Sequence, residues 1–135
     1  MTLKIENLGK VYQDGKVALE GFNWELENGV YGLLGPNGAG KSTLLEILSL
    51  NLTPSSGKIL WDGWNIQKRP ARFRRLLGYL PQNYGFYPEL RCVQVLKYLG
   101  ALHGLRGRKL KRRIAEVIEM VNLERERRRK VKALS

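Results

Sequence analysis

The sequence contains only one cysteine, no long apolar run, and half as many acidic as basic residues. The single cysteine, Cys92, excludes a disulfide within the chain and is typical of a reducing compartment. The longest apolar runs are about five residues, which is too short to span a membrane. Charged residues interrupt the first apolar pattern, so we expect no signal peptide at residues 1–6.

Positive charge is concentrated toward one end of the sequence. Residues 101–135 contain 12 Lys and Arg and 4 Glu, whereas residues 1–100 contain 12 Lys and Arg and 8 Asp and Glu. A basic segment can bind nucleic acid or anionic lipid headgroups. Residues 101–135 contain no aromatic side chain, which argues against a surface on which bases stack. Because runs of charge are usually solvated, we interpret this one chiefly as an exposed helix surface near a partner.

The most specific pattern is a glycine-rich stretch that fits G-x-x-x-x-G-K-[ST], the phosphate-binding loop. It consists of Gly35, Pro36, Asn37, Gly38, Ala39, Gly40, Lys41, Ser42 and Thr43. Glycine readily adopts positive φ angles, which lets successive N–H groups turn inward toward phosphate oxygens. Lys41 adds a positive charge that can reach the outer phosphates, and the Ser42 hydroxyl can ligate Mg²⁺.

The sequence on either side of this stretch supports the interpretation. Residues 30–34 form an apolar run that predicts a buried strand, and apolar residues at helical spacing predict a helix over residues 41–50. The N-terminus of a helix favours an anion. Strand, loop and helix in this order are the context that a phosphate-binding loop requires. The sequence therefore predicts a phosphate site.

The pattern up to the middle of the chain predicts mostly strands. Alternating apolar and polar residues predict strands at 2–8 and 17–26. Shorter apolar runs predict further strands at 58–61 and 77–80, and a short basic helix is expected at 70–76. This part of the chain also contains the phosphate-binding loop.

The rest of the chain is predicted to be helical. Apolar residues three and four apart predict helices over residues 93–102 and 110–121. The change from strand to helix falls near residues 83–88. The sequence therefore predicts two parts, residues 1–82 and residues 83–135.

Several motifs in the right order resemble the ATP-binding subunits of ABC transporters. The stretch 35–43 has the form of the Walker A loop of that family. Tyr12 lies where the family carries an aromatic residue that stacks on adenine, and residues 53–63 are similar to the family's stretch after the Walker A helix. Gln82 is similar to the Q-loop glutamine. Residues 98–105 resemble the efflux-type, or ABC-2, members.

The resemblance implies an α/β fold. It implies a P-loop NTPase core of the ABC type, with an antiparallel β part at the N-terminus, a partial helical subdomain at the C-terminus and an incomplete sheet. In these terms residues 1–82 are the nucleotide-binding core, and residues 83–135 are the remainder of the Q-loop and the helical subdomain.

The resemblance also implies the cofactors ATP and Mg²⁺ and the residues that hold them. Tyr12 and residues 35–43 correspond to the ATP site. Ser42 and Gln82 correspond to Mg²⁺ ligands. Lys41 corresponds to the residue that neutralises phosphate and transition-state charge, and Gln82 also relays the nucleotide state to the membrane subunit.

Other parts of the family pattern do not occur in the sequence. The last residues are Lys132-Ala133-Leu134-Ser135, and in the family Leu-Ser opens the signature motif and precedes Gly-Gly. No run matches the Walker B strand, which ends in Asp-Glu. The resemblance therefore covers the N-terminal part, somewhat over half, of an ABC ATP-binding domain. We expect weak ATP binding at most and no turnover by this chain alone, and marginal stability because the strand at 30–34 has an exposed edge.

By this resemblance the function is ATP hydrolysis that drives transport of a solute across a membrane, with export favoured over import. The resemblance implies a separate transmembrane subunit, a dimer of ATP-binding domains, and a cytoplasmic position at the inner face of the cell membrane. Two alternatives stay open. One is a nucleotide-binding fragment that does not hydrolyse ATP. The other is a nucleic-acid-associated ABC-type ATPase, for which only the net charge of +12 argues, since no base-reading motif is visible.

Overall fold

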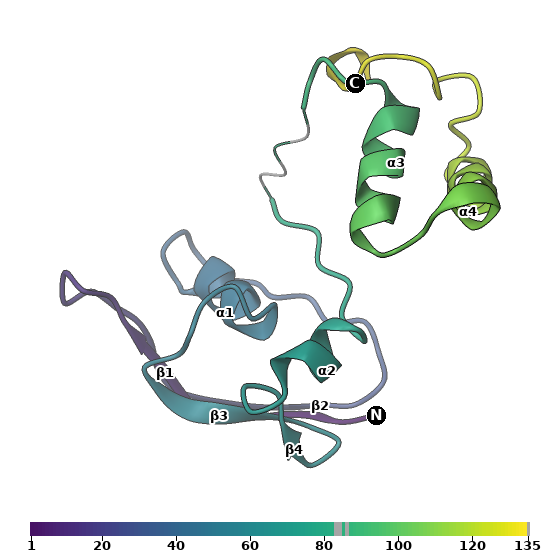
Figure 1. The fold of residues 1–135 in the computed structure, drawn as a ribbon. Helices are drawn as coiled ribbons and strands as arrows, with labels where there is room; N and C mark the ends of the chain where they lie inside the picture. Colours follow the sequence, from purple (N-terminus) through teal and green to yellow (C-terminus); the bar gives the residue numbers. More distant parts are fainter. Residues whose placement is uncertain (83–84, 86, 135) are drawn as a thin grey trace. The chain divides into compact units, whose positions relative to one another are not determined.

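The computed structural model describes residues 1–82, 85 and 87–134 (Figure 1). They form two compact units, of which the first ends at Tyr79 and the second begins at Leu80. The first unit contains β1 (Leu3–Val11), β2 (Val17–Leu26), α1 (Lys41–Leu48), β3 (Ser56–Trp61), β4 (Trp64–Asn65) and α2 (Pro70–Arg74). The second unit contains α3 (Cys92–Leu102), α4 (Gly107–Met120) and the 3₁₀ helix η1 (Val131–Ala133).

The first unit is built on a four-stranded sheet in the order β2-β1-β3-β4, in which every neighbouring pair is antiparallel. The strands predicted at 2–8, 17–26 and 58–61 are confirmed, and so is the antiparallel β part at the N-terminus. A turn with left-handed Asp62 and Gly63 joins β3 to β4 and places Trp61 opposite Trp64. Two-residue turns with a left-handed backbone match the twist of the strands that they join.

A β-bulge in β1 allows Ile5 and Leu8, which are three residues apart, to face the same core. In a regular strand Ile5 and Leu8 would point to opposite faces, because side chains alternate. The register of β1 with β2 shifts between these two residues, and Asn7 adopts a left-handed backbone with φ of 47°. The amide N of Asn7 donates to Asn23 Oδ1 at 2.9 Å. Both Ile5 and Leu8 are therefore fully buried.

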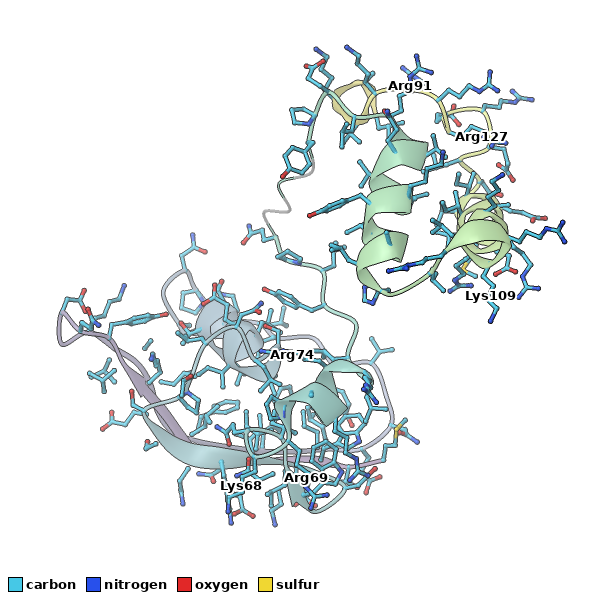
Figure 2. The ribbon with its side chains drawn as sticks, in the orientation of Figure 1. Lys68, Arg69, Arg74, Arg91, Lys109 and Arg127 are labelled. Carbon is cyan, nitrogen blue, oxygen red and sulfur yellow. The ribbon has the colours of Figure 1, made fainter. Side chains whose placement is uncertain are left out.

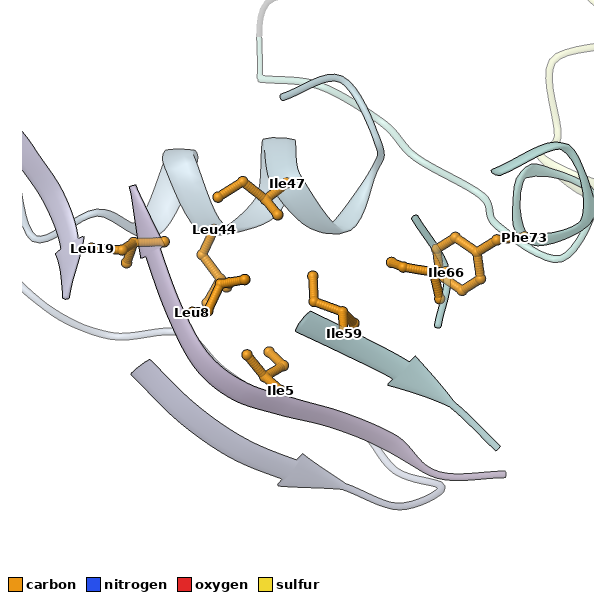
Figure 3. Packing of buried hydrophobic residues seen from close by; sticks show 8 residues of the cluster. All are labelled: Ile5, Leu8, Leu19, Leu44, Ile47, Ile59, Ile66 and Phe73. Atoms are coloured by element: carbon orange, nitrogen blue, oxygen red, sulfur yellow. The ribbon is translucent and has the colours of Figure 1, made fainter. Parts of the chain in front are cut away.

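Helix α1 covers this face of the sheet (Figure 3). Its Leu44 and Ile47 belong to one buried cluster with Leu8 of β1 and Ile59 of β3. Burying each such side chain stabilises the fold by about 1.5–3 kcal/mol. The helix predicted at 41–50 is confirmed, although it ends earlier, before Leu50, whose φ is 60°.

Aromatic side chains attach α2 to the edge of the sheet. Phe73 of α2 is buried and meets Trp61 and Trp64 edge-on, with ring centroids 5.6 and 6.2 Å apart. The guanidinium carbon of Arg72 lies 4.6 Å from the centroid of the Trp64 ring. The short basic helix predicted at 70–76 is confirmed over Pro70–Arg74.

Two predicted strands are wrong. Residues 30–34 and 77–80 have no strand structure, and the side chains of Val30, Leu34 and Leu80 are largely exposed. Their apolar runs are typical of strands buried in a parallel sheet, but a strand forms only where a neighbour exchanges backbone hydrogen bonds with it. Within the described residues, the four strands of the sheet pair only with one another. The structure therefore lacks the strand that was expected before the phosphate-binding loop.

The second unit is helical, as predicted. Val95 of α3 and Ile114 and Ile118 of α4 are buried, which confirms the helices predicted from apolar spacing, whereas Leu102 and Val121 at the ends of the two patterns are exposed. Cys92 is a free, half-buried residue at the start of α3. The boundary predicted at 83–88 includes residues 83, 84 and 86, which lie outside the described residues, so that boundary and the two parts defined by it stay predictions.

The segment after α4 is bound to the segment before α3. Backbone hydrogen bonds of 2.9–3.1 Å join the two; they run from Cys92 to Arg129, from Val93 to Arg127, from Val131 to Leu90 and from Lys132 to Pro88. Glu89 accepts hydrogen bonds from Lys130 Nζ at 2.8 Å and from Lys132 Nζ at 2.7 Å. The Lys130 and Lys132 ammonium groups lower the pKa of the Glu89 carboxyl below its ordinary value of 4.5.

Replacing Glu89 should loosen this attachment in a pH-dependent way. Because the folded pKa of Glu89 is lowered, its ion pairs stabilise the fold fully above pH 4.5 and are lost as the pH falls through the folded pKa. Glu89→Gln should therefore speed amide hydrogen exchange at Cys92 and Val131 at neutral pH.

The matched control is Glu124→Gln, because Glu124 is exposed and makes no ion pair with the described residues. It should leave the exchange at Cys92 and Val131 unchanged. The difference between Glu89→Gln and the natural protein should also vanish in acid. If exchange were equal in both proteins at neutral pH, the attachment would not depend on Glu89.

Candidate phosphate-binding site

The backbone of the glycine-rich loop depends on left-handed glycines. Gly38 and Gly40 have φ angles of 86° and 83°, a region that residues with a Cβ rarely adopt. Gly40 immediately precedes α1 as its N-cap. A Cβ at Gly40 would overlap the carbonyl oxygen of Ala18 in β2, so only glycine fits where the loop passes the sheet. No atom lies within 4 Å of the Cβ position at Gly38, so that position has only the backbone requirement.

The Lys41 side chain turns back over the loop that precedes it. Its Nζ donates hydrogen bonds to the carbonyl oxygens of Gly35 and Pro36, both at 2.6 Å. The amide N of Ala39 also donates to the Pro36 carbonyl at 3.3 Å. The loop is therefore curved, and the Lys41 ammonium group lies against the carbonyl oxygens of Gly35 and Pro36.

Helix α1 directs its positive end toward the loop. The first N–H groups of any helix have no acceptor within the helix, and the aligned peptide dipoles place partial positive charge there. The first turn of α1 contains no acidic residue that would neutralise this charge. Ser42 is exposed in this turn, whereas Thr43 is buried. The start of α1 therefore combines free backbone donors, an exposed hydroxyl and the Lys41 cation, which is an arrangement that suits phosphate oxygens.

Tyr12 lies beside the start of α1. Its hydroxyl is 3.2 Å from Thr43 Oγ1, and Lys10 Nζ is 5.6 Å from the centre of its ring. The tight turn that follows β1 holds this position, because the amide N of Tyr12 donates to the Lys16 carbonyl at 2.9 Å. The structure thus brings Tyr12 and the glycine-rich loop together, although they are far apart in the sequence.

The residues predicted to ligate Mg²⁺ fall in different units. Ser42 belongs to the first unit, and its hydroxyl makes no hydrogen bond with the described residues. Gln82 is exposed and belongs to the second unit. Across the described part of the chain, no three His, Cys, Asp or Glu residues are grouped so that they could hold a metal ion. A single hydroxyl ligand suits Mg²⁺, which keeps several waters and takes phosphate oxygens as ligands.

Sequence reasoning missed two contacts of this site. The carbonyl oxygen of Ala18 restricts the loop at Gly40, and Thr43 lies within hydrogen-bond distance of Tyr12. Both contacts join positions more than 20 residues apart, and no local pattern indicates them.

No helix in the part of the chain that the structure describes is long and apolar enough to cross a membrane.

Comparison with known proteins agrees with this geometry. The sequence profile of the ABC transporter family matches residues 19–135. The chain is 37% identical to the linearmycin resistance ATP-binding protein LnrL of Bacillus subtilis, over 98% of this chain and 43% of that protein. It therefore spans less than half the length of that relative.

Solved structures of ATP-binding proteins have the same fold. The structure of cbiO1 from Clostridium perfringens, described as part of the ABC transporter complex cbiONQ, matches with a TM-score of 0.80 and 31% identity, over 98% of this chain and 55% of that one. A dimeric ATP-binding cassette in a post-hydrolysis state, bound to ADP and Pi, matches with a TM-score of 0.79 and 26% identity, over 98% of this chain and 63% of that one. The profile and the fold together show that the chain belongs to the ABC transporter family, as part of an ATP-binding domain.

Proposed function

We propose that residues 35–43 hold the phosphates of ATP. The observation that carries this proposal is the left-handed backbone of Gly38 and Gly40 directly before α1. Glycines with this backbone let N–H groups turn toward an anion, and the positive end of the helix follows directly. Charge-assisted hydrogen bonds from such donors to phosphate are stronger than bonds between neutral groups.

The individual residues have distinct roles in this proposal. Lys41 exchanges its bonds to the Gly35 and Pro36 carbonyls for bonds to phosphate oxygens. Ser42 supplies a hydroxyl ligand to Mg²⁺, which offsets phosphate charge when it is bound. Tyr12 presents a partly exposed ring on which adenine stacks. Gln82 joins the magnesium site.

We further propose that the whole protein hydrolyses ATP and couples hydrolysis to solute transport through a separate transmembrane subunit. The names of its relatives support this proposal, since one is a resistance ATP-binding protein and another is part of a transporter complex. The dimeric form of a structural neighbour supports a dimer of ATP-binding domains. In this arrangement the protein lies at the cytoplasmic face of the membrane.

Residues 1–135 alone bind ATP without turning it over, in this proposal. Phosphoryl transfer needs a group that positions the attacking water as well as a phosphate cradle. The first acidic residue after the loop is Glu46, which lies within α1, and no apolar run in these residues ends in paired carboxylates. The cradle is therefore present without a matching base.

Lys41→Ala should weaken ATP binding. Losing a hydrogen bond to a charged group costs about 1.5–3 kcal/mol, which corresponds to a rise in Kd on the order of 10- to 100-fold. Lys68→Ala is the control, because Lys68 is exposed and its side chain makes no hydrogen bond with the described residues. Titration with ATP and Mg²⁺ by calorimetry measures both variants. An unchanged Kd in Lys41→Ala would contradict the proposal that residues 35–43 hold the phosphates of ATP.

Gly40→Ala should destabilise the first unit more than Gly38→Ala. A left-handed alanine costs about 1–2 kcal/mol at either position, and the overlap with the Ala18 carbonyl adds about 1–3 kcal/mol at Gly40 only. Urea unfolding measures the free energy of unfolding of each variant. Equal losses would show that the contact with Ala18 does not restrict the loop.

Steady-state ATPase assays should show no turnover by residues 1–135, because they lack a base for water. Release of phosphate is measured in parallel with the Lys41→Ala variant. A rate above background that Lys41→Ala abolishes would contradict this expectation, since it would require a base within these residues.

A further inference from the structure

Cations are concentrated where α3 turns into α4. Residues 90–115 contain eight Lys and Arg and no Asp or Glu, and six of the eight lie in residues 106–113. Arg112 and Arg113 pair with Glu116 at 3.4 and 3.2 Å. The other cations at this turn make no ion pair with any residue that the structure describes.

We call the exposed residues of this turn the α3–α4 corner. The name covers four of these exposed residues, Leu102, Arg106, Arg108 and Lys109. Figure 2 labels Lys109, which projects from the first turn of α4. The corner lies entirely within the second unit.

The charges of the corner oppose the helix on which they lie. The N-terminal end of a helix has partial positive charge, so cations there are unfavourable. The first turn of α4 contains no acidic residue, and neighbouring cations also repel one another. Contacts within the fold therefore do not explain the α3–α4 corner, whereas an external anion would relieve both the repulsion and the unfavourable dipole.

Apolar surface accompanies the cations. Tyr98 and Leu102 are 52% and 66% exposed, and because they lie four residues apart on α3 they share one face. A pocket of about 310 Å³ lies between α3 and α4 and is lined mainly by aliphatic residues, with His103 and Arg113 among its lining residues. Its aliphatic lining consists of Leu96, Leu99, Leu105, Leu110, Ile114 and Val117.

This combination favours a lipid partner over a nucleic acid. Cations that lie a few residues from an exposed leucine, here Leu102, are the composition of surfaces that bind in the membrane interface. Proteins that hold single-stranded nucleic acid combine a basic groove with several aromatic side chains on which successive bases stack, and Tyr98 is the only Phe, Tyr or Trp in residues 90–135.

We propose that the α3–α4 corner binds anionic phospholipid headgroups at a bilayer surface. Arg106, Arg108 and Lys109 contact phosphate groups, and Leu102 enters the boundary between headgroups and acyl chains. This contact is direct, so it does not require a transmembrane subunit, and it does not depend on nucleotide binding at residues 35–43.

Flotation of the full-length protein with lipid vesicles tests the proposal, without nucleotide and without any membrane partner. The protein should float with vesicles that mix phosphatidylcholine and phosphatidylglycerol, and not with vesicles of phosphatidylcholine alone. Binding should weaken as salt increases, because the Debye length is about 8 Å at physiological ionic strength. Each cation near an anionic surface contributes roughly fivefold in binding, so the triple variant Arg106→Gln, Arg108→Gln, Lys109→Gln should bind on the order of 100-fold more weakly.

A variant with the same change in net charge provides the matched control. Lys68→Gln, Arg69→Gln and Arg75→Gln remove three exposed cations from the first unit and should leave vesicle binding unchanged. The corner variant should fold normally, and its melting temperature should equal or exceed that of the natural protein, because the substitutions remove repulsion at the start of α4. Arg106→Lys with Arg108→Lys keeps the charge and should retain binding.

Four results would overturn the proposal. They are equal flotation with neutral and anionic vesicles, full binding by the corner variant, an equal loss in the matched control, and displacement of the protein from vesicles by DNA that it binds more tightly. The last result would identify nucleic acid as the partner of the corner.

Discussion

The close approach of Gly40 to the carbonyl oxygen of Ala18 is the constraint on which the candidate site depends. It sets the point at which the glycine-rich loop leaves the sheet and α1 begins. Leu44 and Ile47 of α1 pack into the core and so hold the helix on the sheet. These contacts hold the loop at the end where α1 begins, so the backbone of Gly40 is fixed by packing within the first unit.

Two apolar segments have no neighbouring strand among the described residues with which to pair. Residues 30–34 and 77–80 have the composition of central strands, yet they pair with nothing among the described residues. One side chain of each segment, Leu33 and Leu77, packs against the core, whose buried residues come from the sheet, α1, α2 and Ile66. The glycine-rich loop is therefore positioned by the antiparallel sheet, α1 and the packing of Leu33 on the core, and not by the strand that the sequence led us to expect before it.

The cations of the second unit fall into two groups, which differ in whether an acidic side chain pairs with them. Lys130 and Lys132 are neutralised by Glu89 and help to attach one segment to another. Arg106, Arg108 and Lys109 make no ion pair with the described residues, at a helix end that disfavours positive charge. The first group is explained by the fold, and the second is explained by a partner outside it. Net charge alone does not separate the two groups, because it counts them equally.

The sequence by itself determined the features that depend on local geometry. The spacing of glycines before Lys41, the alternation in β1 and β2 and the apolar stripes of α3 and α4 are all set by the backbone of a few consecutive residues. These features were sufficient to predict three strands, the helices and the family. Only the tertiary structure decided that 30–34 is not a strand, that Tyr12 contacts Thr43 and that Gly40 must be glycine. Each of these depends on a partner far away in the sequence, and hydrogen bonding and steric exclusion act between atoms that only folding brings together.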